Sequence, residues 1–387
     1  MSTQRPNQGF IFWPVGNGDS TTVVIGGGVT FQVDLNHLES AEEDDDPHAP
    51  VIDELIALLP KVNGKPYLSA FALTHPDQDH CRGFPRLLKE AQIGEIWFTP
   101  RVFREYKSDL SDDAIAFKKE AERRVKKTIQ ARGAVGAGDR IRIVGYDELL
   151  QEEEFEAFPK ELLTVPGQPV TKLDGVERGT LFRAFVHAPF KDDAAGERNE
   201  ASLGLQIRLI GDGKVGHAML LGDLSYPTVK RIFDVSDAED LVWNVLLAPH
   251  HCSKSVMYWQ DEGEEEETLK QDILDVIESQ AGTPGHIVAS SEPVPASNES
   301  GDNPPHAKAK ARYEEIAPDG FLCTQEHLSE TDPKPIVFAM GSTGLAYVRA
   351  ASSQADSAAR TALAAAVERG RGGAEPPKDR VGFGGCR

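Results

Sequence analysis

One short segment constrains this chain more than any other, the run His-Pro-Asp-Gln-Asp-His at positions 75–80. It directly follows the apolar run 68–73, which predicts a buried strand. Two imidazoles and two carboxylates within six residues are the ligand types that hold zinc and similar divalent cations. A plain turn often contains Pro and Asp but seldom carries this set of four. The segment therefore predicts a metal site at the end of a strand.

Two later strand patterns also end in residues that bind metals. Residues 215–222 predict a strand that runs into Asp223, and residues 241–247 predict one that leads to His250-His251. Each signal is weak alone, because strands often end in Gly-Asp and histidine pairs are common in loops. Three such strand ends in one chain predict that their side chains converge on a pair of cations.

The remaining sequence alternates strand and helix patterns, which indicates the class of fold. Further strands are expected at 10–15, 21–25, 29–34, 95–99, 181–187, 203–210 and 286–290, and helices at 51–59, 83–91, 113–132 and 226–233. Two β-rich halves with helices outside them predict an α/β (α+β) fold, built as a four-layered αββα sandwich.

The domain limits follow from changes in composition. One domain is expected over residues 8–349, with an insertion of uncertain structure at 139–178, where the chain is polar and marked by Pro and Gly. Residues 350–387 are rich in Ala, Ser, Arg and Gly and poor in large apolar groups. That composition predicts a low-complexity, flexible tail.

Composition also narrows the classes of function. No run approaches the roughly 20 apolar residues of a membrane helix, and the first residues lack the apolar core of a signal peptide, so a cytoplasmic protein without membrane contact is expected. Four scattered cysteines exclude a disulfide framework and a cysteine-only zinc module. Lys and Arg number 41 against 62 Asp and Glu, a net charge of −21. This acidity disfavours a nucleic-acid partner. The expected helix 113–132 nevertheless has a basic face, which is either an ordinary solvated face or a patch that attracts phosphates.

Taken in order, these motifs resemble the metallo-β-lactamase superfamily, in particular the branch of the hydrolase domain of the bacterial competence DNA-uptake channel. The matching segments are Val-Gly-Asn-Gly-Asp-Ser at 15–20, Val33-Asp34, the HxDxDH pattern at 75–80, Asn-x-x-Ser-Leu at 199–203, Leu-Leu-Gly-Asp at 220–223 and Pro-His-His-x-Ser at 249–253. The wider superfamily has HxHxDH instead. The resemblance covers residues 8 to about 348.

The resemblance implies a set of ligands for two divalent ions. It assigns His75 and Asp77 to one ion and Asp79 and His80 to the other, with Asp223 bridging them.

Three further positions stay open within that set. The fifth motif falls on His250 and His251 without distinguishing between them. The superfamily's middle histidine falls on Asn199, a poorer ligand. His187, at the end of a preceding strand, is either a substitute for it or an ordinary core histidine.

Two cysteines depart from the pattern of the branch. Cys81 follows the last histidine of the first motif, and Cys252 stands where the branch has Gly. A thiolate in the ligand shell would favour zinc over manganese, and zinc is the metal expected here. The alternative is that each cysteine is a small buried residue.

The expected activity is that of a metal-dependent hydrolase using a metal-bridged hydroxide, with Asp79 or Asp77 orienting it. The resemblance favours a phosphodiester substrate, so the chain would be a nuclease or phosphodiesterase acting on nucleic acid or a nucleotide. His306 is a candidate donor to the leaving group, and Lys254 a candidate phosphate contact.

Two alternatives remain from the sequence. The same ions would serve hydrolysis of an ester, thioester or amide, which the negative charge favours. The chain could also be an interaction component of a multi-gene system, for example antiviral defence. Its end, Gly-Gly-Cys-Arg at 384–387, resembles the ends of ubiquitin-like proteins, and in that case it would recruit protein partners. The simpler interpretation is a disordered Gly-rich end.

Overall fold

The computed structural model describes residues 5–43, 45–100, 103, 110–191, 198–299 and 303–349. The chain divides after Tyr347 into two units, and the fold below is that of the first unit. The predicted tail, 350–387, lies outside the described residues. Within the described part of the chain, no helix is both long enough and apolar enough to cross a membrane.

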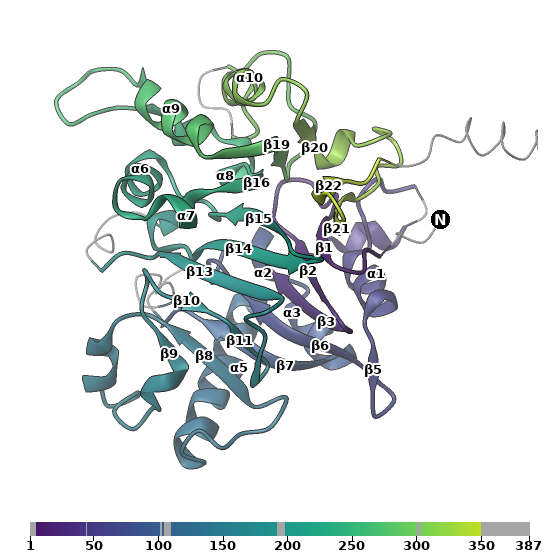
Figure 1. Ribbon diagram of the computed structural model, residues 1–387, viewed down its shortest axis with the longest axis vertical. Helices are drawn as coiled ribbons and strands as arrows, with labels where there is room; N and C mark the ends of the chain where they lie inside the picture. Colours follow the sequence, from purple (N-terminus) through teal and green to yellow (C-terminus); the bar gives the residue numbers. More distant parts are fainter. Residues whose placement is uncertain are drawn as a thin grey trace, which may run out of the picture. The chain divides into compact units, whose positions relative to one another are not determined.

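The first sheet contains the strands of the N-terminal half and a hairpin from the end of the domain (Figure 1). Its order is β22 (Gly344–Tyr347), β21 (Ile336–Gly341), β1 (Gly9–Phe12), β2 (Thr21–Gly26), β3 (Val29–Val33), β6 (Lys65–Ala72), β7 (Gln92–Phe98), β8 (Arg140–Val144) and β9 (Leu163–Thr164), with β5 (Lys61–Val62) beside β6. Strands from β22 to β3 pair antiparallel, and those from β3 to β9 pair parallel.

The second sheet contains the later strands. Its order is β10 (Pro169–Val170), β13 (Phe182–Ala188), β14 (Gly204–Gly211), β15 (Lys214–Leu220), β16 (Trp243–Leu247), β19 (Ala281–Ala289) and β20 (Phe321–Cys323). Strands β15, β16, β19 and β20 are parallel, so their carboxyl ends lie at one edge of the sheet. Two short hairpins belong to neither of these sheets. One pairs β11 (Lys172–Leu173) with β12 (Val176–Glu177), and the other pairs β17 (Tyr258–Trp259) with β18 (Thr268–Leu269).

Alternating side chains explain why the two sheets pack face to face. Val245 and Leu247 of β16 point into a core that also holds Phe31 of β3 and Ala70 of β6. The intervening residue Leu246 points the other way, into a second core beneath helices. A strand with apolar side chains on both faces is buried on both sides, which is the pattern of an inner layer.

Helices cover the outer face of each sheet (Figure 1). On the first sheet lie α1 (Val51–Leu58), α3 (Phe84–Glu90) and α5 (Asp112–Gln130), and on the second α6 (Tyr226–Val235), α7 (Ala238–Leu241), α9 (Gln271–Ser279) and α10 (Ala307–Ile316). Phe117 of α5 and Phe84 of α3 pack on Phe71, the outward-facing residue of β6. The predicted four-layered αββα sandwich is therefore confirmed.

Helix α5 shows both the success and the error of the helical pattern. It begins at Ser111, whose hydroxyl accepts a hydrogen bond from the amide of Ala114 at 3.2 Å. Its buried side carries Ala114, Phe117, Ala121, Val125 and Thr128, as the 3.6-residue spacing predicts. Arg124, expected on the charged face, is buried instead and donates to the carbonyls of Ile93, Gly94 and Arg140.

The insertion at 139–178 takes part in both sheets. Its strands β8 and β9 extend the first sheet, and β10 pairs with β13 in the second.

Candidate metal centre

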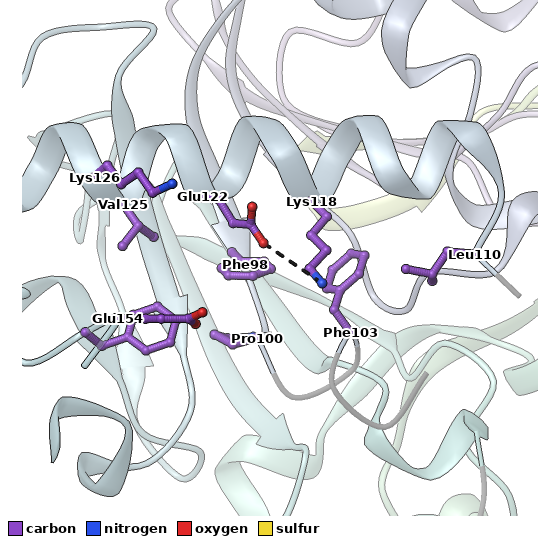
Figure 2. Close-up of a pocket in the computed structure, with 10 residues that line it drawn as sticks. Phe98, Pro100, Phe103, Leu110, Lys118, Glu122, Val125, Lys126 and Glu154 are labelled. Carbon is purple, nitrogen blue, oxygen red and sulfur yellow. Dashed lines mark ion pairs between the residues drawn. The ribbon is translucent and has the colours of Figure 1, made fainter. Parts of the chain in front are cut away.

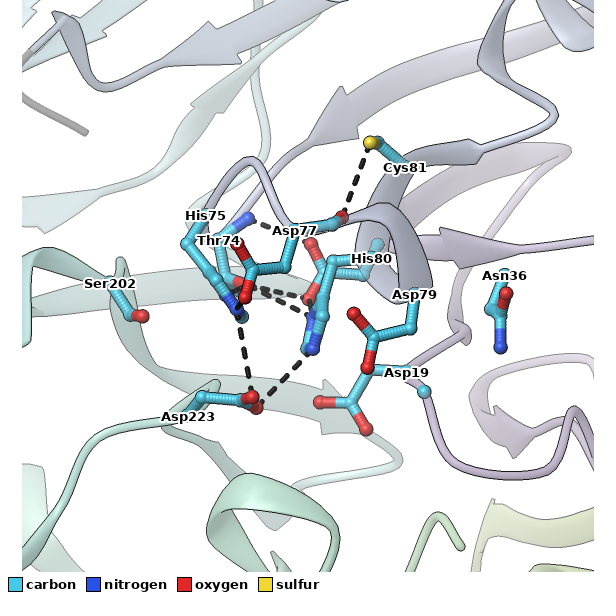
Figure 3. A network of polar contacts seen from close by, with 12 residues as sticks. Asp19, Asn36, Thr74, His75, Asp77, Asp79, His80, Cys81, Ser202 and Asp223 are labelled. Carbon is cyan, nitrogen blue, oxygen red and sulfur yellow. Dashed lines mark hydrogen bonds and ion pairs between the residues drawn. The ribbon is translucent and has the colours of Figure 1, made fainter. Parts of the chain in front are cut away.

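Four buried side chains converge where strands of both sheets end. One ligand atom each from Asp19, His80, Asp223 and His251 lies within 4.8 Å of the others, and all four residues are buried. We call these four residues the metal cluster. His80 follows β6 in the first sheet, whereas Asp223 and His251 follow β15 and β16 in the second. The convergence of strand ends that the sequence predicted is present in the structure (Figure 3).

His80 is held in one orientation by a buried aspartate. Its Nδ1 lies 2.8 Å from Oδ2 of Asp34. That carboxylate also accepts from the amide and the hydroxyl of Thr74, each at 2.7 Å. Because a carboxylate only accepts, Nδ1 is the nitrogen that keeps its proton, and Nε2 is the nitrogen that would bind an ion after losing its own proton. Nε2 therefore faces Oδ1 of Asp223, 3.3 Å away, as a metal ligand would.

His75 is fixed in the same way through Thr74. The Thr74 hydroxyl gives its single proton to Asp34, so it accepts from Nδ1 of His75, 3.1 Å away. Nε2 of His75 therefore carries a lone pair, and it lies 3.6 Å from Oδ2 of Asp223 and 3.7 Å from Oδ2 of Asp77.

His251 points its free nitrogen at the same carboxylate. Its Nδ1 lies 3.2 Å from the carbonyl oxygen of Ser290, which only accepts, so Nε2 again bears a lone pair. Nε2 is 3.3 Å from Oδ2 of Asp79 and 3.5 Å from Oδ2 of Asp223. Asp19 completes this side, with Oδ1 3.5 Å from Nδ1 of His251.

The residues fit a divalent cation. Among the buried atoms without a hydrogen-bond partner in the described residues are three that face one another here, namely Nε2 of His75, Oδ1 of Asp19 and Oδ1 of Asp223. Unsatisfied buried groups are costly, so each calls for a partner outside the chain. Ligands held tetrahedrally at about 2.1 Å from an ion stand about 3.4 Å apart. The spacings of 3.3 Å from His251 to Asp79 and 3.7 Å from His75 to Asp77 match that value.

The charges in the cluster support one another. Burial alone would raise the pKa of Asp223, but the neighbouring His251 and His80 hold it well below its usual range. Burial likewise opposes the charge on His80, yet Asp223 and Asp34 raise its pKa well above the ordinary value. Burial, together with the charge on His80, lowers the pKa of His75 to about 3, so this imidazole stays neutral.

The other predicted site residues differ in what they contact. Nε2 of His250 is 3.6 Å from Oδ2 of Asp223. Asn199 lies in the turn Arg198–Ala201, and its side-chain oxygen has no hydrogen-bond partner among the described residues. His306, the residue before α10, accepts from the amide of Lys254 at 3.2 Å. The amino group of Lys254 itself pairs with Glu267 at 2.6 Å.

His187 makes its contacts elsewhere. Its Nδ1 lies 3.0 Å from the hydroxyl of Ser236 and its Nε2 3.0 Å from the carbonyl of Asp240. Both ring nitrogens are thus engaged near the end of α6 and in α7, as in an ordinary core histidine.

The two cysteines next to the ligands do not enter the metal cluster. Cys81 donates to the carbonyl of Asp77 at 3.2 Å, on the side of the loop away from Asp223 (Figure 3). Cys252 is buried in the core beneath the helices of the second sheet. Burial raises the pKa of both thiols, which keeps them protonated. The preference for zinc therefore has no support from a thiolate.

Two residues of the site were not recognised from the sequence as parts of it. Asp34 and Asp19 both fall in segments that carried the resemblance, but neither received a role. Asp19 is placed by Gly18, because a Cβ at Gly18 would lie 2.3 Å from Nδ2 of Asn36 and 2.6 Å from the carbonyl of Asp79. The amide of Asp19 donates to that carbonyl at 3.2 Å, which joins this loop to the segment 75–80.

Two hollows are lined by none of the metal-cluster residues. One of about 400 Å³ lies between α5 and the end of β7, lined by Phe98, Phe103 and Val125 (Figure 2). Another, of about 610 Å³, is lined by Ser253 and His306, by residues of the β17–β18 hairpin and by three consecutive glutamates, 265–267.

Comparison with known proteins gave matches among solved structures only. No protein-family model and no curated protein matches the chain. The metallo hydrolase Igni18 from Ignicoccus hospitalis is 11% identical, with a TM-score of 0.40, over 85% of this chain and 98% of its own. The metallo-β-lactamase SMB-1 is 12% identical, with a TM-score of 0.36, over 72% and 94%. The metallo-β-lactamase BJP-1 of Bradyrhizobium japonicum is 13% identical, with a TM-score of 0.34, over 72% and 90%.

Proposed function

We propose that this protein is a metal-dependent hydrolase with two divalent ions, and that its substrate is a phosphodiester of nucleic acid or of a nucleotide. The observation that carries the first part is the set of imidazole nitrogens that follow β6 and β16 and are directed at Asp223, which follows β15. The resemblance to the DNA-uptake branch supports the second part.

The two kinds of carboxylate would have different tasks. A bound divalent ion supplies Lewis acidity, which polarises the bond under attack and lowers the pKa of water from 15.7 to about 7. Asp223, with its side chain 5% exposed, lies between both groups of ligands and would be shared by them. Asp79 and Asp77, 33% and 19% exposed, border the open side, where they would orient the attacking water.

Residues past the histidine turn would meet the leaving group. His306 contacts the amide of Lys254, so both residues adjoin the turn that carries His251. His306 would donate a proton to the leaving group, and Lys254 would contact a phosphate after exchanging its partner Glu267.

The test is a substrate screen on protein loaded with zinc or manganese. We expect cleavage of bis(p-nitrophenyl) phosphate and of DNA, RNA or a cyclic nucleotide, lost on chelation. Asp79→Ala should lower the rate by more than about a hundredfold, since even residues behind the ligands contribute 10–100-fold. Asp275→Ala, which removes an exposed carboxylate of α9 that contacts Gln271, should leave it unchanged. Activity that survives chelation contradicts the metal dependence.

A second substrate class is favoured by the charge around the site. The hollow lined by Lys254 and His306 is also lined by glutamates 265–267, and the whole chain carries −21. Acidic walls repel a polyanion and tolerate a neutral ester, thioester or amide. Hydrolysis of p-nitrophenyl acetate or a thioester, without any phosphodiester cleavage, would replace the first assignment with this one.

A further inference from the structure

The turn that carries the paired histidines has an unusual backbone. His250, His251 and Cys252 have φ angles of 51°, 52° and 66°, all in the left-handed region. That region is unfavourable for side chains with a Cβ, and a run of three such residues persists only when the surroundings fix it. Part of that fixation is a hydrogen bond from the amide of His250 to the carbonyl of Gly222, 3.0 Å long.

The left-handed turn brings both imidazoles to one carboxylate oxygen. Nε2 of His250 lies 3.6 Å from Oδ2 of Asp223, and Nε2 of His251 lies 3.5 Å from the same atom. The two rings are inclined at 76° with centroids 6.0 Å apart, so they approach that oxygen from different directions. An extended backbone would direct consecutive side chains to opposite sides, and only one ring would reach Asp223.

The neighbours of each ring differ. Nε2 of His251 adjoins Asp79 and Nε2 of His80, both at 3.3 Å. His250 and His75 reach Oδ2 of Asp223 at 3.6 Å each, as His251 does at 3.5 Å, but among the described residues neither lies within 4.0 Å of a carboxylate oxygen of Asp79.

We propose that both histidines of the turn are metal ligands, one for each ion, an inference that rests on the proposed function. His251 binds one ion together with Asp79 and His80, and His250 binds the other together with His75 and Asp77. Asp223 is shared. Each ion then receives two imidazoles and at least one carboxylate of its own, with Asp19 also available to the ion at His251, a set suited to zinc. His250 thereby supplies the imidazole that the amide at position 199 does not.

The experiment counts bound ions rather than turnover. Metal-free full-length protein is titrated with Co²⁺, followed by calorimetry and by the visible absorption of the bound ion. We expect wild type to bind two ions, and His250→Asn to bind one with wild-type affinity and the other more than tenfold more weakly. Asn tolerates the left-handed backbone, so the turn is kept. His250→Gly serves as the second variant if the first does not fold. His217→Asn, a change on β15 away from the turn, is the matched control.

Double variants identify which ion each histidine holds. His75→Ala combined with His250→Asn should bind one ion with wild-type affinity, as each single variant does, because both changes affect one site. His80→Ala combined with His250→Asn should bind neither ion with wild-type affinity, because the changes affect different sites. Asn199→Ala should leave both affinities unchanged.

The outcomes separate this inference from the function on which it rests. Two ions bound with wild-type affinity by His250→Asn overturn the inference and leave the hydrolase intact. A weakened ion in Asn199→Ala instead overturns it in favour of the amide. A single ion in wild type overturns the inference and the two-ion part of the proposed function but leaves a metal-dependent hydrolase, whereas no ion in wild type overturns the proposed function as a whole.

Discussion

At the scale of single residues, the protons on the imidazoles are assigned by their outer partners. Asp34, Thr74 and the carbonyl of Ser290 each accept a hydrogen bond from the Nδ1–H of one histidine, namely His80, His75 and His251. Nε2 is therefore the nitrogen of each ring that is left to bind an ion. These partners do not touch the presumed ions, yet they decide which nitrogen is able to bind them. Asp34 acts on His80 directly and on His75 through Thr74, so it has the widest influence.

Replacing Asp34 with Asn should therefore weaken metal binding without removing a ligand. An amide presents one acceptor and one donor where the carboxylate presents two acceptors, so the orientation of His80 is lost. We expect the affinity for zinc to fall 10–100-fold, measured by competition with a chromophoric chelator. Glu95→Gln, which changes a buried carboxylate of β7 paired with Arg142, is the control and should keep wild-type affinity.

His187 gives a pH dependence that is independent of the metal. Burial lowers its pKa to about 4, below the value of about 6.5 in the unfolded chain. The unfolded state thus binds more protons between these values, and stability falls as the pH falls from 6.5 to 4. The group should contribute a loss of about 2 kcal/mol between pH 7 and 5.

Urea unfolding of metal-free wild type and His187→Gln at both pH values measures this effect. The variant should be less stable at pH 7, because hydrogen bonds to Ser236 and Asp240 are disturbed, but its stability should change less with pH. Equal pH dependence in the two proteins would contradict the assignment.

At the scale of helices, strands and loops, periodicity predicted which segments pair but not where they stop. The first strand was expected over 10–15 and ends at Phe12, because Pro14 has no amide hydrogen to continue the ladder. The strand expected at 286–290 begins at Ala281 instead. The first residues of this strand include Gly282 and Gly285, so they lack the apolar pattern by which a strand is predicted. Pairing with Trp243 of β16 extends β19 back to Ala281.

The loop before β2 has a structural requirement of its own. Gly18→Ala would place a methyl group 2.6 Å from the carbonyl of Asp79, and the loop or the segment 75–80 would have to shift. Because Asp19 belongs to the metal cluster and Asp79 contacts His251 of that cluster, we expect weaker metal binding in this variant, measured by calorimetry. Gly136→Ala, where a Cβ has no neighbour within 4 Å, should bind as wild type does.

At the scale of the whole domain, the site could be predicted in part because its ligands cluster along the chain. Histidines and aspartates at 75–80 are unusual for a turn, so they were recognisable without a structure. Asp19 and Asp34 look like ordinary loop aspartates, and only the tertiary packing brings them to His251 and His80. The buried position of Arg124 was not predicted for the same reason, since its partners include, besides Glu120 of the same helix, carbonyls of the strands β7 and β8.

Metal removal should lower the stability of the entire domain. The ligands belong to both sheets, so ions bound there stabilise the folded state relative to the unfolded chain. At a zinc concentration 100 times the dissociation constant, one ion adds about 2.7 kcal/mol. Chelation should lower the thermal midpoint of wild type, and re-addition of zinc should restore it. Asp223→Asn, which lacks the shared carboxylate, should show little response to either.

The distribution of ligands between the two sheets also determines when the metal site forms during synthesis of the chain. Asp19 and His251 are separated by most of the domain, and the second sheet contributes Asp223 as well. During synthesis the emerging N-terminal half therefore presents only part of a chelating set. Position 251 must leave the ribosome before a complete one exists, and closure of such distant contacts is slow. Ion capture should consequently be a late event in the maturation of this chain.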